Sequence, residues 1–354
     1  MSAPDSVINV DKIERIIFFG NAGIGNFILY LPTLRTIKQL YGNLEITCII
    51  LKKQLREIAR QCHFIDKIID MTNPSNFLKI CTLHKAAVLL SIHDCYIYPL
   101  ALSIFSRPKY IVGFERVAHW KNKYSQLLTH TITVDKITKE VLYSGKLLEP
   151  FGVPHHETTF SAPFFPALKK ARYDGLFRKK QHENLLIGMH VSSSPSQPWK
   201  AWELHKFSKI SELIIDNFPN TRLLFFGTPD AATEIDNVIK TLPSNRCEKL
   251  IGHPLSVVAY WLSKCFLLVC NDGGLMHIAD ALGIKTVAIF GPTDHRIFGP
   301  SRGSVVRLGL SCSPCYSFPG DQKYPLRCKD RLCLKRISAE LVWKFILDVL
   351  EGLK

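Results

Sequence analysis

The sequence has no long hydrophobic run and no leader-like N-terminus. No apolar stretch reaches the roughly 18 residues that a membrane-spanning helix requires. The first residues, MSAPDSVINVDKIERIIFFG, carry acids before any apolar stretch and lack the basic, apolar and small-residue order of a secretory signal. We therefore expect a cytoplasmic protein that is either soluble or peripheral on the inner face of the cytoplasmic membrane.

Nucleotide-binding motifs of two large enzyme classes are also missing. No G-x-x-x-x-G-K-[ST] motif occurs, which argues against a P-loop nucleotidase. Gly20, Gly23 and Gly25 follow the first expected strand, but their spacing is not G-x-G-x-x-G. The second strand ends in Leu51-Lys52 rather than in an acid that could hold a ribose, so a dehydrogenase is not expected. The glycines let a backbone loop approach a substrate, or they form an ordinary tight turn.

Acidic residues are scarce relative to basic ones, with 30 Asp and Glu against 45 Lys and Arg and a formal net charge of +15. This excess suits a nucleic acid, an anionic membrane surface or phosphorylated small molecules. We do not expect a nucleic acid, because no recognition helix or aromatic platform accompanies the charge. One basic group is either a solvated loop or a site for an anionic acceptor or lipid head groups. It comprises Arg107, Lys109, Arg116, Lys121 and Lys123, with Phe114 and Trp120 between them.

Short apolar strands alternate with amphipathic helices in both halves of the chain, which predicts an α/β fold with a doubly wound parallel sheet in each half. In the first half we expect strands at residues 15–19, 45–51, 64–69, 86–91, 109–114 and 131–134, with helices at 24–41 and 52–62. In the second half we expect strands at residues 184–190, 221–226, 266–270 and 286–290, with helices at 203–217, 229–241, 255–263 and 274–282.

The length of 354 residues suggests two domains. A basic stretch with prolines at residues 157–181 interrupts the alternation and is typical of a linker. We place an N-terminal domain at residues 1–165 and a C-terminal domain at residues 166–338. A last helix at residues 339–354 can cross back onto the N-terminal domain.

Polar residues and glycines collect directly after the expected strands. Ligands of doubly wound sheets bind beyond the carboxyl ends of the strands, so these residues are candidates for the chemistry. The turn Asn271-Asp272-Gly273-Gly274 separates a buried strand from a helix, and the unpaired amides and partial positive charge of a helix start suit an anion such as phosphate. The other strand ends carry Asn26, His93 with Asp94, and His190 with Ser192 and Ser193.

The cysteines, 11 in number, fall into two groups. Most are scattered, several of them in apolar runs, and behave as small buried hydrophobic residues in a reducing compartment. The others, Cys312, Cys315, Cys328 and Cys333, form the pattern C-x2-C-x12-C-x4-C in a segment rich in proline, glycine and lysine. That spacing is consistent with a tetrahedral thiolate site for zinc or iron. The alternative is a loop that carries reduced cysteines.

Several motifs follow one another in a fixed order along the chain. They are Gly23-Ile24-Gly25-Asn26, Leu31-Pro32-Thr33-Leu34-Arg35, Gly188-Met189-His190, Lys200-Ala201-Trp202, Asn271-Asp272-Gly273-Gly274-Leu275-Met276-His277, and Phe290-Gly291-Pro292-Thr293. In this order they resemble the heptosyltransferases of glycosyltransferase family nine, and the similarity extends from Arg15 to about Val342. The resemblance implies the GT-B architecture, in which two Rossmann-like domains face a central cleft.

The resemblance implies an inverting glycosyltransferase that moves a sugar, heptose from ADP-heptose, onto a lipopolysaccharide core or a related phosphorylated glycolipid or glycan. A protein acceptor, or a catalytically weak paralogue that only binds a nucleotide sugar, is the alternative. Lys200 and the amides after Asp272 would stabilise the negative charge that develops on the departing diphosphate. The residues expected to bind the donor are Gly25, His190, Ser192, Ser193, Lys200, Asp272, Gly273, Gly274 and His277.

One departure from the family concerns the general base. Many members carry an aspartate at the position of Asn26, and that aspartate is the expected base. An asparagine cannot accept a proton at neutral pH, although it can orient a hydroxyl group. We therefore expect Asp94, beside His93, to act as the base in its place. The alternative is a structural aspartate that closes a turn.

No Asp-x-Asp pair occurs, so the carboxylate clamp that holds a metal ion and a diphosphate in other glycosyltransferases has no ligands here. We expect no catalytic metal. The resembled family includes protein heptosyltransferases that hold iron and carry similar cysteine clusters. Thiolates at Cys312, Cys315, Cys328 and Cys333 would close the coordination sphere of zinc or iron and make that site structural.

Overall fold

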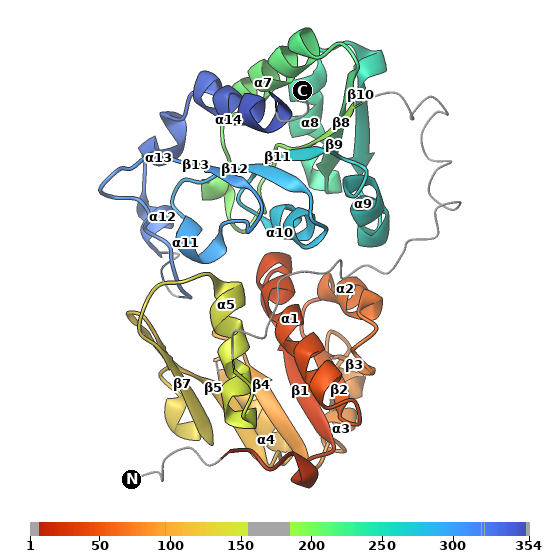
Figure 1. Ribbon diagram of the computed structural model, residues 1–354, viewed down its shortest axis with the longest axis vertical. Coiled ribbons are helices and arrows are strands. Elements are labelled where there is room, and N and C mark those ends of the chain that lie inside the picture. The colour runs from red at the N-terminus through yellow and green to blue at the C-terminus, as the bar shows by residue number, and fades with distance from the viewer. Residues whose placement is uncertain (1–6, 96, 155–184, 320, 322, 352–354) are drawn as a thin grey trace. The chain divides into compact units, whose positions relative to one another are not determined.

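Two predominantly parallel sheets organise the chain, one in each of two compact units, Met1–Ser161 and Ala162–Lys354 (Figure 1). The computed structural model describes residues 7–95, 97–154, 185–319, 321 and 323–351. The linker expected at residues 157–181 and the domain boundary expected after residue 165 lie outside the described residues.

The sheet of the N-terminal unit has 7 strands in the order β3-β2-β1-β4-β5-β6, with β7 also paired to β5. All of these pairings are parallel except that of β5 with β6. The apolar central strands are buried along almost their whole length, as in a sheet that is covered on both faces. The strands are β1 (Arg15–Gly20), β2 (Glu45–Ile50), β3 (Lys67–Asp70), β4 (Ala86–Leu90), β5 (Tyr110–Val117), β6 (Trp120–Lys121) and β7 (His130–Val134).

Helix α1 (Ile24–Leu40) packs against the short helix α5 (Glu140–Ser144) in this unit. The hydroxyl oxygens of Thr33 and Ser144 lie 3.1 Å apart, and Ser144 Oγ donates to the Leu29 carbonyl oxygen over 3.1 Å. This contact directs the first residue of α5 toward the first turn of α1. The unit also contains α2 (Leu55–Gln61), α3 (Phe77–Ile80) and α4 (Ile97–Phe105), together with 3-10 turns at Val10–Lys12, Pro74–Asn76, Ser125–Leu127 and Gly145–Phe151.

The sheet of the C-terminal unit has 6 strands in the order β10-β9-β8-β11-β12-β13, and all of their pairings are parallel. Its strands are β8 (Leu185–His190), β9 (Thr221–Gly227), β10 (Cys247–Ile251), β11 (Leu267–Asn271), β12 (Lys285–Ile289) and β13 (Ser304–Val306). Its helices are α7 (Leu204–Asn217), α8 (Ala232–Ile239), α9 (Leu255–Leu262), α10 (Gly274–Ala281), α11 (His295–Phe298), α12 (Lys323–Arg327), α13 (Leu332–Lys335) and α14 (Ala339–Glu351), with 3-10 turns at Pro198–Lys200, Pro229–Ala231 and Ser244–Arg246. The predicted α/β class with two doubly wound parallel sheets is confirmed.

The last helix, α14, packs on α7, β12 and β13 of the C-terminal unit (Figure 1). Its side chains Val342, Ile346 and Leu350 belong to the hydrophobic core of that unit. The apolar face of α14 is therefore covered within the C-terminal unit.

Candidate functional site

Three polar side chains meet at the carboxyl ends of the neighbouring strands β1 and β4. Asn26 stands in the first turn of α1, His93 follows β4, and Glu140 opens α5. Asn26 Nδ2 lies 2.7 Å from His93 Nε2 and donates to Glu140 Oε2 over 3.1 Å. His93 Nε2 lies 2.8 Å from Glu140 Oε1. We call Asn26, His93 and Glu140 the Asn26 cluster.

Hydrogen bonds fix the loop that carries His93 on both sides of this residue. The His93 amide donates to Ser91 Oγ over 3.2 Å, and Ser91 Oγ in turn donates to Asp94 Oδ2 over 2.6 Å. Asn21 Nδ2 donates to the His93 carbonyl oxygen over 3.2 Å. The His93 side chain is 12% exposed, whereas that of Glu140 is fully buried. The Asn26 cluster therefore presents part of an imidazole ring to the surface, with a buried carboxylate behind it.

Asp94 does not present its carboxylate to the surface, which argues against the expectation that it is the base. It is 1% exposed, and its Oδ2 atom accepts the Ser91 hydroxyl. The Oδ1 atom is buried and has no hydrogen-bond partner among the described residues. Burial raises the pKa of Asp94 to about 7, against the opposing effects of the Ser91 hydrogen bonds and the charge of His93. The geometry fits the alternative reading, a structural aspartate that closes the turn at His93.

Gly25, expected to contact the donor, is buried in the first turn of α1 beside Asn26. Helix α1 begins at Gly23, which provides no side-chain cap for the first amides. Gly25 thus lies in the N-terminal unit, next to the Asn26 cluster. The other residues expected at the donor belong to the C-terminal unit.

Lys200 and Asp272 form an ion pair in the C-terminal unit, with Lys200 Nζ 2.8 Å from Asp272 Oδ2 and both side chains largely buried. Lys200 Nζ also lies 5.4 Å from the ring centroid of Trp199 and 5.6 Å from that of Tyr316. The two rings meet edge to face at 5.3 Å. Cation–π attraction adds to the ion pair, so the ammonium group is held in place just before α10. We call Lys200, Asp272, Trp199 and Tyr316 the Lys200 group.

The buried amide of Asn271 joins the segments around the Lys200 group. Its Nδ2 atom donates to the carbonyl oxygens of Val191 and Ser192 over 2.9 and 3.2 Å. Its Oδ1 atom accepts the Trp202 amide over 3.0 Å. Because β8 and β11 are neighbours, these bonds gather the residues that follow both strands. The expected residues Ser192, Ser193, Lys200 and Asp272 are thereby brought to one end of the sheet.

His190 and the start of α10 complete this end of the sheet. Burial lowers the pKa of His190 to about 4, and its Nδ1 atom is buried without a hydrogen-bond partner among the described residues. Gly273 has an extended backbone, and a Cβ at this position would lie 4.0 Å from His190 Cε1, so the ring faces this turn. No side chain caps α10, which begins at Gly274, and His277 is buried in that helix. The neutral imidazole of His190 and the first amides of α10 therefore lie at the same end of the sheet as Lys200.

The segment that contains the four clustered cysteines is attached to the loop after β12. Cys315 N donates to the Pro292 carbonyl oxygen over 2.8 Å, and Asp294 N donates to the Tyr316 carbonyl oxygen over 2.8 Å. These backbone bonds hold the Tyr316 ring against Lys200. The cysteine segment therefore supplies part of the Lys200 group.

Gly291 allows the cysteine segment to approach the end of β12 closely. Ser313 Oγ donates to the Gly291 carbonyl oxygen over 2.6 Å. A Cβ at Gly291 would lie 2.5 Å from Leu334 Cγ, closer than real carbon atoms approach. Only glycine leaves room for Leu334 of α13 at this position.

The four clustered cysteines differ in exposure but influence one another electrostatically. Cys312 and Cys328 are exposed, Cys315 is half-buried and Cys333 is buried. Burial raises the pKa of Cys333 to about 11, with further contributions from the other three thiolates. Burial also raises the pKa of Cys315, aided by Cys328 and Cys312. Within the described residues, no three histidine, cysteine, aspartate or glutamate side chains are arranged as a metal site.

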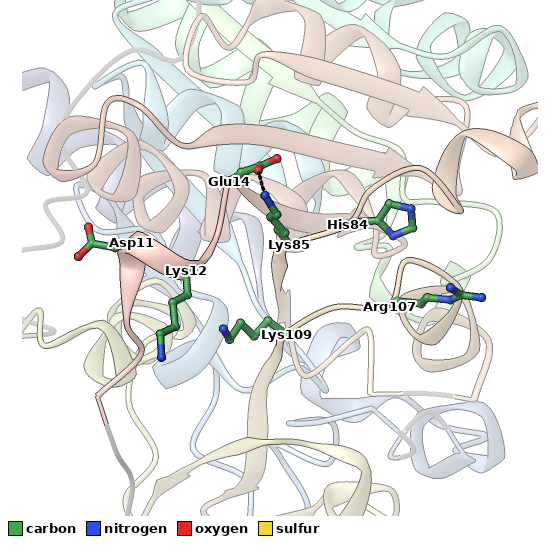
Figure 2. A pocket seen from close by; sticks show the side chains of 7 residues that line it. All are labelled: Asp11, Lys12, Glu14, His84, Lys85, Arg107 and Lys109. Carbon is green, nitrogen blue, oxygen red and sulfur yellow. Dashed lines mark hydrogen bonds and ion pairs between the residues drawn. The ribbon is translucent and has the colours of Figure 1, made fainter.

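A basic cavity of about 590 Å³ lies at the opposite edge of the N-terminal sheet from the Asn26 cluster (Figure 2). It opens where β1, β4 and β5 begin, so it is remote from the carboxyl ends of these strands. Lys85 Nζ pairs with Glu14 Oε1 at 2.6 Å, which leaves an excess of positive charge around the cavity. Its lining residues are Asp11, Lys12, Glu14, His84, Lys85, Arg107 and Lys109.

Glu140, Asn271 and Tyr316 are site residues that the sequence did not identify as such. Asn271 was visible as the first residue of the Asn-Asp-Gly-Gly turn, and Tyr316 as the neighbour of a clustered cysteine. Glu140 carries no signal of this kind, because it stands alone in a short helix and meets Asn26 across 114 residues of sequence.

Comparison with protein families and curated proteins gives a consistent result. A family model described as glycosyltransferase family 9 (heptosyltransferase) matches residues 105–322. The chain is 31% identical over 168 residues to lipooligosaccharide heptosyltransferase 2 of Campylobacter jejuni serotype O:6, a match that covers 44% of this chain and 49% of that relative. It is 20% identical over 311 residues to lipooligosaccharide heptosyltransferase 2 of Haemophilus influenzae, covering 83% of this chain and 88% of the relative. The chain thus spans about half the length of the C. jejuni relative.

Solved structures agree on the fold. The ADP-heptose lipopolysaccharide heptosyltransferase II of Escherichia coli superposes with a TM-score of 0.73 at 17% identity, covering 96% of this chain and 99% of that one. A family 9 glycosyltransferase of Veillonella parvula gives a TM-score of 0.78 at 19% identity, covering 98% and 100%. The iron-containing dodecameric glycosyltransferase TibC of enterotoxigenic E. coli gives 0.57 at 13% identity, covering 97% and 78%. The predicted GT-B fold class and the predicted family resemblance are confirmed.

We expect Asp94→Asn to be more stable than the wild type at about pH 8 and to lose this advantage as the pH falls toward about 5. The folded pKa of Asp94, about 7, lies above its ordinary value of 3.8. Between these values the folded chain keeps a proton that the unfolded chain has released, so the wild type loses stability as the pH rises. Asparagine has no such proton and can still accept the Ser91 hydroxyl.

Thermal unfolding followed by circular dichroism across this pH range measures the difference. A difference in melting temperature that does not change with pH would show that burial does not raise the pKa of Asp94.

Proposed function

Since the chain belongs to glycosyltransferase family 9 (heptosyltransferase), we propose that it is an inverting transferase that moves heptose from ADP-heptose onto a lipopolysaccharide core or a related phosphorylated surface glycan. The observation that carries this proposal is the Lys200–Asp272 ion pair at the uncapped start of α10. A fixed cation and free helix amides at one strand end form a site for a diphosphate. We place the reaction in the cytoplasm.

Lys200 is the residue to which we assign stabilisation of the leaving group. When the sugar departs, negative charge develops on the diphosphate, and a cation held in place in advance lowers the energy of that state. Asp272 stands at the amino end of α10, where the helix dipole favours a negative charge, and it keeps the Lys200 ammonium pointing toward the same end of the sheet.

The remaining donor contacts follow from the same geometry. We propose that Ser192, Ser193 and His190 form hydrogen bonds with the hydroxyl groups of the donor. The Nδ1 atom of His190 is buried and has no hydrogen-bond partner among the described residues. His190 stays neutral at pH 7 because its pKa is lowered, so it can donate or accept without adding charge. We propose that the donor comes close to the backbone at Gly273, Gly274 and Gly25, where no side chain intervenes. His277 is buried in α10 and helps to hold this helix in place.

Lys200→Met is expected to lower kcat/KM for sugar transfer, measured as ADP formed, by about 100-fold or more, because it removes charge stabilisation from the transition state. Lys200→Arg keeps the charge and should retain more activity. The assay incubates the purified protein with ADP-heptose and lipopolysaccharide that lacks heptose, and measures ADP and the mass of the product. Lys249→Met is the control, because Lys249 forms an exposed ion pair with Asp236 elsewhere in the same unit.

The alternatives give different results in this assay. Transfer to a protein but not to lipopolysaccharide would replace the proposed acceptor. Binding of ADP-heptose without turnover on any acceptor would identify a nucleotide-sugar-binding paralogue. Equal activity of Lys200→Met and the wild type would remove Lys200 from the mechanism.

We further propose that Cys312, Cys315, Cys328 and Cys333 hold a structural zinc or iron ion. Two observations support the site: the pKa of Cys315 and that of Cys333 are raised by burial and by the other clustered cysteines, and backbone hydrogen bonds fix the segment at the end of β12. Thiolate sulfur suits both metals, and four such ligands leave no position for a substrate. The ion would stabilise the segment that carries Tyr316, and we expect no metal in the chemical step.

Metal analysis of the purified protein should find about one zinc or iron ion per chain. The double variant Cys312→Ser/Cys315→Ser should lose the metal and melt at a lower temperature, because it loses two of four ligands. Cys81→Ser/Cys247→Ser is a matched control, since these two half-buried cysteines lie outside the segment. A wild-type protein that contains no metal would contradict the site.

The basic cavity and an exposed apolar patch beside it support peripheral binding to an anionic membrane. None of the helices in the described ranges is long and apolar enough to cross a membrane. Leu78, Ile104 and Phe105 are 74%, 54% and 51% exposed, although their side chains are apolar. Phe105 packs edge to face on Phe77 at 5.0 Å, which joins α3 to α4. Basic residues next to exposed apolar ones suit lipid head groups and the chains below them.

Arg107→Glu/Lys109→Glu should bind vesicles that contain phosphatidylglycerol more weakly than the wild type, because the charges that attract the head groups are reversed. Co-sedimentation with such vesicles, compared with phosphatidylcholine vesicles and at raised salt, measures the effect. Lys240→Glu/Lys249→Glu reverses two exposed charges in the other unit and serves as the control. Wild-type binding that ignores lipid charge would contradict the proposal.

A further inference from the structure

We propose that His93 is the general base of the transfer reaction and that Glu140 and Asn26 are the residues that position it. The inference rests on the proposed function, because it concerns the acceptor hydroxyl group of that reaction. It starts from the Asn26 cluster, in which an asparagine stands where the family often has an aspartate. The question is which group takes over the proton.

Glu140 determines the arrangement of hydrogens in the Asn26 cluster. Its carboxylate is fully buried, and a buried carboxylate is stable only when donors satisfy its oxygens. Asn26 Nδ2 reaches Oε2 at 3.1 Å, and His93 Nε2 reaches Oε1 at 2.8 Å. Asn26 Nδ2 and His93 Nε2 also lie 2.7 Å apart, and a hydrogen bond between them would require Nε2 to accept. We assign the hydrogen to Nε2 instead, because a bare Nε2 would direct its lone pair at the buried Oε1 atom of Glu140 over 2.8 Å.

This arrangement fixes the tautomer of His93. If Nε2 carries the hydrogen that it donates to Glu140, then Nδ1 carries a lone pair in the neutral ring. The ring is partly exposed, and no described residue forms a hydrogen bond with Nδ1. Nδ1 is thus the atom of the cluster that is both basic and able to meet a hydroxyl group from outside.

Acidic and phenolic groups lie around His93. Glu140 of α5 faces the ring directly, and Asp94 lies next to it in its own loop. Tyr30 of α1 and Tyr143 of α5 also face Glu140, and the pKa of both phenols is raised well above the ordinary value by burial and by this carboxylate. Lys52, after β2, faces Asp94 rather than the ring. A neutral imidazole beside a carboxylate can therefore accept a proton as the reaction proceeds.

In the proposed step, proton transfer accompanies formation of the new glycosidic bond. The acceptor oxygen forms a bond to the anomeric carbon of the sugar as its O–H bond breaks, and the proton moves to His93 Nδ1. The bond from the anomeric carbon to the diphosphate oxygen breaks on the opposite face, and its electron pair leaves with ADP. His93 becomes an imidazolium paired with Glu140, and the proton later returns to solvent.

Asn26 has a purpose in this scheme that an aspartate could not fulfil. An aspartate at residue 26 would place a second carboxylate within about 3 Å of Glu140, and two carboxylates this close cannot both ionise. Asparagine instead donates a hydrogen bond to Glu140 and adds no charge beside it. The same substitution that removes the usual base therefore supports the base that replaces it.

His93→Gln should lower kcat by about 10²- to 10⁴-fold, because general-base catalysis contributes that much, and leave the Kd for ADP-heptose within about threefold. Glu140→Gln should lower kcat less than His93→Gln does and leave the Kd for ADP-heptose unchanged, because the imidazolium that forms during transfer loses its anionic partner. His63→Gln is the matched control, because His63 is an exposed histidine of the same unit.

Nitrogen chemical shifts of the histidine rings give a readout that does not depend on turnover. We expect the Nε2–H tautomer of His93 in the wild type and a mixture of both tautomers in Glu140→Gln. Circular dichroism shows whether each variant is folded, and His93→Asn provides a second substitution if His93→Gln is not.

The outcomes separate this inference from the proposed function. A wild type that transfers no sugar refutes both. An active wild type with His93→Gln equally active, or with the hydrogen on Nδ1 of His93, refutes the base and leaves the transferase activity intact. Loss of activity in Asp94→Asn but not in His93→Gln would return the role of base to Asp94.

Discussion

The C-terminal unit depends on the side-chain amide of Asn271. This one buried group uses both of its hydrogens and its oxygen to bind the backbone of segments far apart in sequence, at Val191, Ser192 and Trp202. Without it, two carbonyl oxygens and one amide would be buried without partners, at a cost of about 1–3 kcal/mol each. The residues that follow β8, the turn with Lys200 and the start of α10 keep their relative positions because of these bonds. Asn271, the residue before Asp272, thus helps to determine where the Lys200 ammonium lies.

Polar groups gather at the equivalent point of the sheet in both units. Both sheets have the order third, second, first, fourth and fifth strand, and in both the polar groups gather where the first and fourth strands end side by side. In the N-terminal unit this point holds Asn26 and His93, and in the C-terminal unit it holds Ser192 and Asp272. The chain reverses its winding direction at this point, so neighbouring loops separate and leave strand ends accessible. The polar groups at this point differ: an amide and an imidazole lie there in the N-terminal unit, and a hydroxyl and a carboxylate in the C-terminal unit.

The positions of the central strands could be predicted well from the local sequence, whereas several edge strands could not. Strands β1 and β8 lie within one residue of the expected positions, because continuous apolar runs can only be buried in the middle of a sheet. Strands β6, β10 and β13 were not expected, since edge strands are short, half polar and formed only through their neighbour. The same limit applies to the site. His93 and Asp94 are adjacent in sequence, and only the hydrogen bond from Ser91 decides that Asp94 is buried while His93 reaches the surface.

Contacts between residues that are far apart in the sequence could not be predicted from the sequence alone. The donor turn was recognisable because its residues are consecutive, and Lys200 because it belongs to an ordered motif. Glu140 meets Asn26 only after α5 has packed on α1, which is a property of the tertiary structure. A sequence can show that residue 26 is an asparagine, but only the packing of two helices shows that the Glu140 carboxylate lies against Asn26 and His93.

The absence of a side chain at Gly291 links the cysteine segment to the Lys200 group. Leu334 occupies the space that a Cβ at Gly291 would need, and the segment seated there carries Tyr316 to the Lys200 ammonium. The four clustered cysteines and the Lys200 group therefore share one stretch of backbone. Oxidation of the exposed thiols of Cys312 and Cys328 would act on this same stretch. In this fold, a change in the redox state of these thiols has a physical route to the surroundings of a buried ammonium group.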